Sequence, residues 1–507
     1  MNSKQLALHI HPNDNVVVAL HDLPAGQNLG GLIPAQFVPA GHKIARRLIQ
    51  TGEAVVKYGY PIGVARRDIQ PGEHVHVHNV ASVLAGDLKP GGFHAGSVAG
   101  QESPRGAQFL GPVTFDGFRR VNGSVGVRNE IWIVNTVACV NQTAAWIAER
   151  AARELASEKS AVEGVYSFSH PFGCSQLGDD LTGTQRLLAG LAKHPNAAGV
   201  LVLGLGCENN RLEAFLKFLG EDIRDRVRFF NAQEVSDERQ EGLRLVRELA
   251  EYAGQFRREP VPAAELILGM KCGGSDGFSG ITANPLVGRV ADRLAALGGT
   301  SILTEVPEMF GAEQVLLARA ANAGVYDGTI KLVDGFRQYF LRHGQPVDEN
   351  PSPGNKDGGI TTLAEKSLGC VQKAGTAPVK QVLDYGEQAA GGLGGVALLN
   401  GPGNDGVSGS ALCAAGAHLV LFTTGRGTPM GFPVPTLKIS TNTSLAERKR
   451  GWIDYSAGGL ADGTADMDAL ADELFRLVLE VASGRRRTQS ELHGYREIAI
   501  WKDGVTL

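Results

Sequence analysis

The chain contains 507 residues, 67 of them glycine, and carries a formal net charge of -4 at pH 7. That length exceeds the size at which one hydrophobic core keeps growing, so roughly two to four domains are expected. The small net charge argues against a general nucleic-acid-binding protein. The sequence contains no run of about 18 apolar residues, so no membrane span is predicted. The N-terminus lacks a secretory-signal pattern and the 6 cysteines are widely spread, so a cytoplasmic location without a disulfide framework is predicted.

Residues 1–85 are predicted to form a small β-rich domain. Short apolar stretches such as NVVVAL and EAVVKYGYPIGVA alternate with turns, and the phrases LPAG, VPAG and IQPG repeat one turn chemistry of apolar residue, proline and glycine. Residues 86–115, which include GGFHAGSVAGQESPRG, are rich in Gly, Ser and Pro and show no periodicity. A linker is therefore predicted there.

Three histidines of this first domain, His74, His76 and His78, stand at every second position with Val75 and Val77 between them. On a strand, alternate side chains leave opposite faces, so the three imidazoles would share one face. Such a face either binds a metal ion or is exposed and solvated. Two histidines at this spacing can chelate one ion, and imidazole suits iron, manganese or zinc, whereas three in line rarely fit a single ion.

From residue 116 onward, apolar runs alternate with amphipathic stretches. EIWIVNTV leads into TAAWIAERAARELA, ELILGM leads to NPLVGRVADRLAALG, and HLVLFTT is the last predicted strand. Repeated strand, loop and helix predict mainly parallel sheets covered by helices. The predicted fold is therefore α/β, with a small β-rich domain (1–85), a linker (86–115) and two α/β domains (116–257 and 258–507) that meet at REPVPAAE.

Polar, small or nucleophilic residues follow the predicted strands. Ligands of open α/β sheets bind beyond the carboxyl ends of the strands, because the loops and the helix N-termini converge there. Cys174 follows VYSFS, Cys207 follows LVLGLG and Cys272 follows LILGM, so their thiolates could meet at one metal ion or iron–sulfur cluster. The alternative is that each is a buried small hydrophobic residue.

Cationic side chains beside glycine or proline turns indicate an anionic ligand. Lys43 lies in AGHKIA, Lys356 in NPSPGNKDGG and Arg426 in GRGTP. A long lysine is usually only solvated, whereas Arg426 stands between two glycines after an apolar strand. That position favours bidentate recognition of a carboxylate by Arg426.

Taken together, these phrases resemble the altronate and galactarate dehydratase family over essentially the whole chain. The matching stretches are NDNVVVAL, PAGHK, VVKYGYPIG, GEHVHVHN, FSHPFGCSQLGDD, VLGLGCENN, CGGSDGFSGITANP, TEVPEMFGAE, NPSPGNKDGGITTLAEKSLGCVQKAG and FTTGRGTP. The first domain resembles the SAF-type domain that family members carry in front of a two-part catalytic body. The galactarate branch lacks the GEHVHVHN histidines and has a serine where this chain has Cys370, so the altronate branch is favoured.

The resemblance implies a lyase that dehydrates a hexonate, D-altronate to 2-dehydro-3-deoxy-D-gluconate, with the help of Fe(II) or Mn(II). The reaction needs a base for the proton beside the carboxylate, an acid for the departing β-hydroxyl and positive charge against the enediolate. Our hypothesis assigns His170 as base or acid, with His42 or Lys43 as its partner. Substrate contacts are assigned to Arg426, Lys356, Asn209, Asp276, Asn284, Glu305 and Thr428, and metal ligation to Cys174, Cys207, Cys272, His74 and His76.

Other functions stay open at this point. The chain could be a galactarate dehydratase or a sulfolactate sulfo-lyase, which resembles the same family. An iron–sulfur cluster on the three strand-end cysteines could replace the divalent ion. A non-catalytic sugar-acid sensor is the alternative outside the enzymes, although the many titratable groups at strand ends argue against it. The expected partner is the small sugar acid, and a homo-oligomer is expected only because such assemblies are common.

Overall fold

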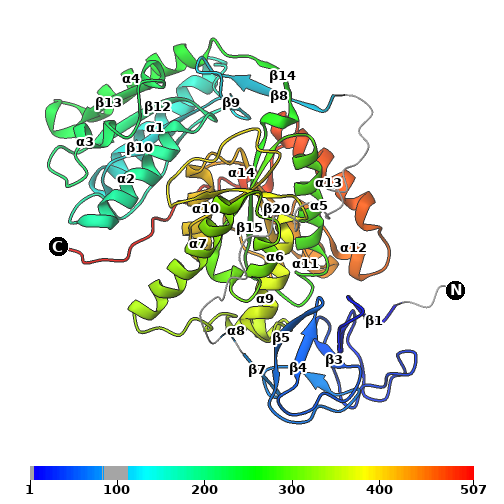
Figure 1. Cartoon of the computed structure of the whole chain (residues 1–507). Helices are drawn as coiled ribbons and strands as arrows, with labels where there is room; N and C mark the ends of the chain where they lie inside the picture. The colour runs from blue at the N-terminus through cyan, green and yellow to red at the C-terminus, as the bar shows by residue number, and fades with distance from the viewer. Residues whose placement is uncertain (1–4, 83, 85–111) are drawn as a thin grey trace.

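The computed structural model describes residues 5–82, 84 and 112–507. In Figure 1 the N-terminal domain (blue) and the middle domain (cyan to green) lie at opposite ends, with the C-terminal domain between them. The α/β class predicted from the sequence is confirmed. The predicted linker, 86–115, lies outside the described residues except for 112–115, and the first strand of the middle domain already begins at Thr114.

The N-terminal domain consists of two small antiparallel sheets, in the orders β1-β2-β3-β6 and β4-β5-β7. The glycines that end LPAG, VPAG and IQPG all have positive φ, between 82° and 83°, which is why the repeated turn needs glycine. The strands are β1 (Ala7–Leu8), β2 (Val16–Ala19), β3 (Lys43–Ala45), β4 (Ala54–Lys57), β5 (Tyr60–Ala65), β6 (His74–Val75) and β7 (Val80–Ala81).

The middle domain is built on a parallel sheet in the order β11-β10-β12-β13. Its strands are β10 (Glu130–Asn135), β11 (Gly164–Ser167), β12 (Ala197–Gly204) and β13 (Val227–Asn231), and its helices are α1 (Asn141–Ser157), α2 (Gly178–Lys193), α3 (Leu212–Leu216) and α4 (Glu238–Ala253). A second sheet joins β8 (Thr114–Arg119), β9 (Val125–Gly126) and β14 (Arg258–Pro262). The stretch REPVPAAE, expected at a boundary, therefore begins as a strand that pairs antiparallel with β8.

The C-terminal domain is built on a parallel sheet in the order β17-β18-β16-β15-β19-β20-β21. The strands are β15 (Ile267–Cys272), β16 (Thr300–Leu303), β17 (Val379–Leu383), β18 (Gly395–Leu399), β19 (Leu419–Thr424), β20 (Thr436–Ser440) and β21 (Tyr455–Ser456). The helices are α5 (Ala283–Ala296), α6 (Glu313–Leu317), α7 (Ala323–Arg342), α8 (Pro353–Asp357), α9 (Leu363–Cys370), α10 (Asp405–Ala414), α11 (Thr443–Arg448), α12 (Gly458–Ala461), α13 (Met467–Ala482) and α14 (Gln489–Leu492). The strand predicted last, HLVLFTT, is followed by β20 and β21.

The hydrophobic core runs through both faces of this seven-stranded sheet. In β19, Leu419 and Leu421 belong to a cluster that continues into the N-terminal domain, whereas Val420 and Phe422 belong to a cluster shared with the middle domain. Alternate residues of a strand point to opposite faces, so a strand covered on both sides is apolar throughout. The central sheet thus shares hydrophobic core with both outer domains.

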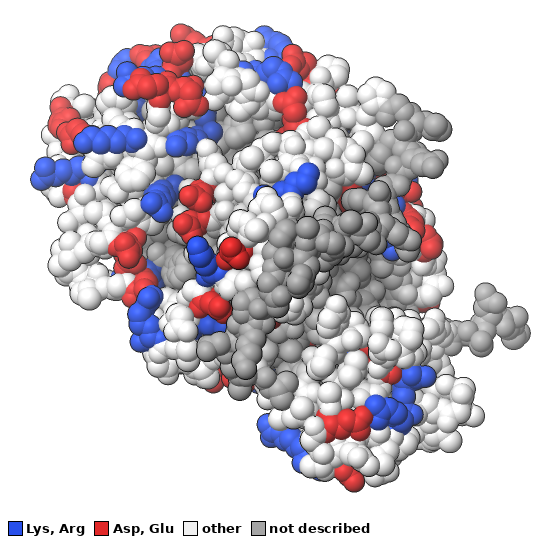
Figure 2. All heavy atoms as spheres, in the orientation of Figure 1, with Lys and Arg blue, Asp and Glu red and all other residues white. Residues whose placement is uncertain are grey.

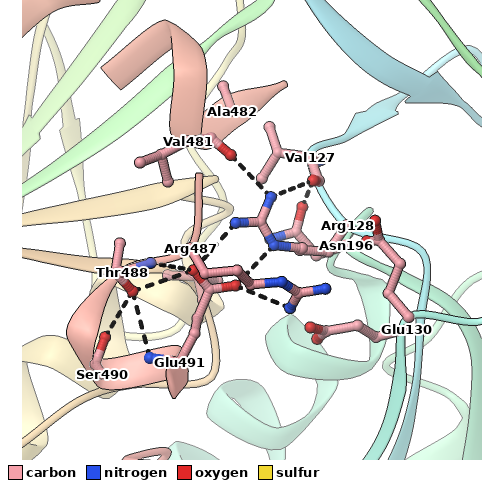
Figure 3. Close-up of polar contacts among 12 residues, drawn as sticks. Val127, Arg128, Glu130, Asn196, Val481, Ala482, Arg487, Thr488, Ser490 and Glu491 are labelled. Carbon is pink, nitrogen blue, oxygen red and sulfur yellow. Dashed lines mark hydrogen bonds and ion pairs between the residues drawn. The ribbon is translucent and has the colours of Figure 1, made fainter. Parts of the chain in front are cut away.

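Buried ion pairs fix the middle domain against the end of the chain (Figure 3). Arg128, which is fully buried, donates to both carboxylate oxygens of Glu491, at 2.8 and 3.1 Å, and to the carbonyl oxygen of Val481 at 2.9 Å. Arg496 pairs with the buried Glu130 at 3.1 Å. Removal of one partner from such a pair leaves an uncompensated charge, so these contacts hold the two domains in one orientation.

The face drawn in Figure 2 carries positive and negative side chains in alternation. On α4, for example, Arg244 pairs with Glu241 and Glu248, and Arg247 pairs with Glu154 of α1. Such exposed pairs contribute about 0–1 kcal/mol each, and their mixed signs create no large single-sign field on this face.

Candidate active site and metal centre

Four metal-type donors meet at the carboxyl edge of the seven-stranded sheet. Cys272 ends β15, Glu305 follows β16, Glu308 lies in the short helix η6 (Val306–Met309), and Cys370 ends α9. Their ligand atoms all lie within 4.8 Å of one another, and all four side chains are buried. Within the described ranges, this donor cluster is the one group of three or more His, Cys, Asp or Glu side chains as close as this.

The geometry of the donor cluster is tight. The Cys272 sulfur lies 3.7 Å from the Cys370 sulfur and 3.2 Å from a Glu308 oxygen. Glu305 has a left-handed backbone with φ of 68°, a conformation that costs a non-glycine residue about 1–2 kcal/mol. Backbone strain of this kind persists where the surroundings hold a side chain in one place, as they do at functional sites.

Three lysines surround the carboxylates of the donor cluster, Lys271 and Lys373 fully buried and Lys366 mostly buried. Lys271 bonds one oxygen of Glu305, and Lys373 bonds the other at 2.8 Å. Lys366 lies 2.8 Å from Glu308. Buried ammonium groups are stable only when they are paired, so lysines and carboxylates here depend on one another.

These pairings fix the protonation states of the site. Burial favours the neutral form of Glu308, but the three lysines outweigh it and lower the pKa of this carboxyl to about 2. The pKa of the Cys370 thiol is raised well above its usual range by its hydrogen bond with Cys272 and by burial. Burial opposes the charge of Lys373, yet the surrounding sulfur and carboxylate groups raise its pKa. A metal ion bound here would displace thiol protons, so its affinity would rise with pH.

The N-terminal domain is docked on this edge by a buried triad of Lys43, Lys57 and Glu365. Glu365, in α9, lies 2.8 Å from Lys57 and 2.9 Å from Lys43, and Lys43 also donates to the carbonyl oxygen of Gly359 at 2.7 Å. None of the three side chains is more than 1% exposed. The triad therefore joins the two domains through charges that are out of contact with solvent.

Two ammonium groups in the triad share one carboxylate, and their pKa values separate. Burial opposes the charge of Glu365, but both lysines stabilise it and lower its pKa to about 2. Burial lowers the pKa of Lys43 to about 8, because attraction to Glu365 offsets only part of the loss of solvation. For Lys57 the attraction exceeds the effect of burial, and the pKa is raised. Lys43 is thus the lysine that can become a neutral amine near physiological pH.

The histidines of the first domain lie beside this triad. Strand β6 ends at Val75, and His76 begins a turn in which its carbonyl oxygen accepts the N–H of Asn79 and Val80. The strand expected over the three histidines is therefore shorter than predicted. Their rings are neighbours nonetheless, with centroids of His74 and His76 5.5 Å apart and those of His74 and His78 5.3 Å apart.

His42 completes the histidine group. Its Nδ1 lies 3.0 Å from Nε2 of His74, and its Nε2 lies 3.2 Å from the carbonyl oxygen of Asp357 in the C-terminal domain. His76 contacts the hydroxyl of Thr361 at 3.0 Å. Burial is the main cause that lowers the pKa of His42, of His74 to about 4 and of His76 to about 3. The three rings are therefore neutral at pH 7, the form in which histidine binds metal or accepts a proton.

A small cavity lies between the triad and the donor cluster. Its volume is ≈ 10 Å³, room for about one water molecule. Lys57 and Tyr58 of the N-terminal domain line it together with Asp276, Asn284, Glu365, Lys366 and Cys370 of the C-terminal domain. The candidate active site is therefore shared by two domains, and its cavity is narrow in this conformation.

Two of the predicted substrate contacts brace the strand-end loops. Asp276 accepts hydrogen bonds from Thr441 at 2.9 Å and from Ser279 at 3.1 Å. Asn284 donates to the carbonyl oxygen of Gly369 at 2.9 Å and accepts from Thr423 at 2.6 Å. Both side chains face the cavity but already have protein partners.

The predicted cations occupy the same edge of the sheet. Arg426 is exposed after β19, with its backbone N–H bonded to the carbonyl oxygen of Gly274 at 3.0 Å, and its side chain lies beside Gly354 of α8. Lys356 is half-buried in the last turn of α8, and Thr428 is half-buried two residues after Arg426. This arrangement leaves Arg426 free to meet an anion from solvent.

The remaining predicted residues lie on a different sheet, that of the middle domain. His170 is buried, and both ring nitrogens have backbone partners, the carbonyl oxygen of Asn135 at 2.9 Å and the N–H of Phe172 at 3.2 Å. Asn209 accepts the N–H of Ser175 at 2.7 Å. Cys174 and Cys207 are exposed. The donors that lie close to Cys272 are Cys370, Glu305 and Glu308, and not the predicted Cys174 and Cys207. We therefore leave these residues out of the active site proposed below.

The sequence reasoning missed several residues of the site, notably Lys57, Lys271 and Glu365. A usable signal was present in two cases, since VVKYG and LILGMK each place a lysine inside an apolar strand. A charge in such a position must find a buried partner. Glu365 gave no such signal, because an acidic residue in the first turn of a helix is ordinary.

Metal-type donors and lysines at the carboxyl edge of a parallel sheet define an α/β enzyme that acts on an anionic substrate. Among the described helices, none is both long and apolar enough to cross a membrane. Three family descriptions match the chain: the altronate/galactarate dehydratase SAF domain at residues 5–83, the second domain of D-galactarate dehydratase/altronate hydrolase at 117–254, and the C-terminal D-galactarate/altronate dehydratase domain at 263–506.

Similar proteins extend over the whole chain. The altronate dehydratase of Bacillus subtilis is 49% identical over 99% of both chains, and that of Escherichia coli is 47% identical over 99% of both. The galactarate dehydratase (L-threo-forming) of Escherichia coli is 33% identical over 97% of this chain and 96% of its own. The chain therefore belongs to the D-galactarate and altronate dehydratase family, as its sequence motifs predicted.

Proposed function

We propose that this protein dehydrates D-altronate to 2-dehydro-3-deoxy-D-gluconate. The observation that carries the proposal is the buried donor cluster with its lysines, in a chain that is 49% and 47% identical to two altronate dehydratases over nearly its full length. Identity to the galactarate enzyme is lower, at 33%. The predicted cytoplasmic location and homo-oligomeric state remain predictions.

Cys272, Cys370, Glu305 and Glu308 would hold the divalent ion, Fe(II) or Mn(II). Two sulfur donors beside two carboxylates suit Fe(II) better than Mn(II), because thiolates are soft ligands. When bound, such an ion polarises the substrate carboxylate and stabilises the negative charge of the enediolate. The predicted ligands His74 and His76 lie outside this cluster, and we assign them to the proton chemistry of the N-terminal domain instead.

We assign proton abstraction to Lys43. A base must lose its own proton near the working pH, and the pKa of about 8 given by burial places Lys43 in that range. His42, adjacent in sequence and neutral at pH 7, is the second choice for the same role. The protonated groups that line the cavity, Lys57 and Lys366, would meet the substrate carboxylate with positive charge. The proton that Lys43 takes from carbon would leave with the β-hydroxyl as water.

Exposed cations would complete recognition of the acid. Arg426 and Lys356 border the loop after β15, and a guanidinium binds a carboxylate through two parallel hydrogen bonds. Hydroxyl groups already occupy the oxygens of Asp276, so we assign Asp276 to positioning of the site. Glu305, predicted as a substrate contact, is assigned to the metal set instead.

A product assay on altronate, galactarate and sulfolactate, with metal content measured on the same preparation, tests the proposal. We expect a kcat/KM for altronate at least about tenfold above the others, a ratio within reach of hydroxyl recognition. The variant Cys413→Ala, which changes a fully buried cysteine of α10 outside the site, should keep this ratio. Faster turnover of galactarate or sulfolactate would reassign the substrate, and binding without product in metal-replete buffer would indicate a sensor.

A further inference from the structure

Three exposed cysteines gather at the carboxyl edge of the middle sheet, away from the donor cluster. Cys139 lies four positions after the end of β10 in the short helix η2 (Ala138–Val140), Cys174 follows β11, and Cys207 follows β12. Strand β10 lies between β11 and β12, and all pair in parallel, so the three loops leave neighbouring positions of one edge. The other three cysteines of the chain are buried.

Backbone hydrogen bonds tie the three cysteine loops together. The N–H of Ala138 donates to the carbonyl oxygen of Phe172, and the N–H of Asn210 donates to that of Gly173, both at 2.9 Å. A Cβ on Gly173 would lie 2.0 Å from the carbonyl oxygen of Thr136, so this loop crosses directly over the end of β10. The loop of Cys174 is thus bonded to the loops of both other cysteines.

Buried side chains hold these loops in place from below. The carboxylate of Glu208 accepts the hydroxyl of Thr136 at 2.6 Å and the N–H of Gly206 at 2.7 Å, which fixes the loop of Cys207 to the end of β10. His170 spans the ends of β10 and β11 through its two backbone partners. The arrangement is that of a prepared site, because each loop is anchored by groups that are themselves buried.

Unpaired polar atoms lie at the same edge. The side-chain oxygens of Asn135 and Asn231 and the side-chain nitrogen of Gln176 are buried without a hydrogen-bond partner, and their residues are 0%, 7% and 2% exposed. An unpaired buried polar group costs about 1–3 kcal/mol, so its presence indicates that something else completes the site. Asn135 ends β10, Asn231 ends β13, and Gln176 follows Cys174 by two residues.

We propose that Cys139, Cys174 and Cys207 bind an iron–sulfur cluster of the [4Fe–4S] type. At least one pair of their sulfurs is more than 4.8 Å apart, whereas a single tetrahedral ion with bonds of about 2.3 Å needs sulfurs about 3.8 Å apart. A cubane cluster bonds each thiolate to a different iron and accommodates the wider spacing. The sequence analysis grouped Cys174 and Cys207 with Cys272. In the cluster proposed here, Cys139 takes the place of Cys272.

Binding of the cluster is a ligand exchange at iron. Each thiol forms one Fe–S bond to a preassembled cluster in exchange for a small thiolate ligand, which takes up the proton of the thiol and leaves, with no change in oxidation state. Three protein ligands leave the fourth iron open to water or to a small oxygen ligand such as a carboxylate. The inference does not depend on altronate as the substrate, because it rests only on the middle domain.

The test uses the full-length protein, purified without oxygen and reconstituted with sulfide and equal amounts of ferrous and ferric iron, which match the iron oxidation states of a [4Fe–4S]2+ cluster. We expect about four irons and four acid-labile sulfides per chain, with broad visible absorption. The triple variant C139S/C174S/C207S should lose iron, sulfide and colour together. Because all three thiols are exposed, its melting temperature should stay close to that of the wild type; if it falls, the three single variants replace it.

Two controls separate this site from the active site. Cys413→Ala removes a buried cysteine of α10 and should keep the cluster. C272S/C370S should lose altronate turnover but keep the visible absorption, so failure of the proposed function leaves the cluster measurable. The inference is overturned if reconstituted wild-type protein contains no acid-labile sulfide, if the triple variant keeps its cluster, or if C272S/C370S abolishes it.

Discussion

Replacement of Glu365 by Gln should undock the N-terminal domain. The ordinary pKa of this carboxyl, 4.5, falls to about 2 in the folded protein, and one pKa unit corresponds to about 1.4 kcal/mol, so its charge contributes about 3 kcal/mol. Because the folded pKa is the lower one, this contribution is complete above pH 4.5 and is lost as the pH falls toward 2. The variant leaves Lys43 and Lys57 without a counter-charge. The estimate of about 3 kcal/mol is close to the loss of about 3–5 kcal/mol that is typical when one partner of a buried pair is removed.

Denaturant unfolding at pH 7, followed by hydrogen exchange of the amides in β3 and β4, measures this effect. We expect a loss of about 3 kcal/mol in the transition of the N-terminal domain and faster exchange in both strands. The matched control is Glu53→Gln in the same domain, which removes an ion pair with Arg47 whose side chains are 33% and 57% exposed. It should cost less than about 1 kcal/mol. Equal midpoints for Glu365→Gln and wild type would refute the role of the triad.

Other predictions address the chemistry and the loops. Lys43→Met should lower altronate turnover by about a hundredfold or more. The variant should also lose the rise of kcat/KM with pH through about 8 that we expect of the wild type, because only the amine form of Lys43 accepts a proton. If the variant keeps that rise, Lys43 is not the base. Chelator treatment should abolish turnover, with Fe(II) restoring more than Mn(II), whereas full activity in metal-free protein would contradict the donor cluster. Gly425→Ala places a Cβ 2.2 Å from Asp276 and should destabilise the fold by about 1–3 kcal/mol, while Gly335→Ala, with open space around it, should be neutral or stabilising in thermal unfolding.

The sequence predicted the strands that are apolar on both faces and missed strands that carry charge. β20 has Lys438 at its centre, and that residue is fully buried although its type suggests exposure. β13 contains Arg228, whose guanidinium pairs with Glu248 of α4. Whether a charged residue stands inside a strand depends on its tertiary surroundings, which the sequence does not show.

The site was predictable in its location and less so in its membership. Cys272 ends β15 and Glu305 follows the adjacent strand β16, so the rule that strand ends converge places them together. The same rule does not say to which sheet a strand belongs, and Cys174 follows a strand of the middle domain. Cys370 comes from the end of a helix, where periodicity gives no reason to expect a ligand.

The cavity beneath Lys57 and Tyr58 has consequences for the catalytic cycle. A six-carbon acid does not fit a space of ≈ 10 Å³, so binding of a hexonate there would require the N-terminal domain to move away from α9. Each turnover then includes one opening and one reclosing, and solvent viscosity should slow the enzyme even when the chemistry itself is fast. The reclosed chamber would keep bulk solvent away from a reaction whose own product is water.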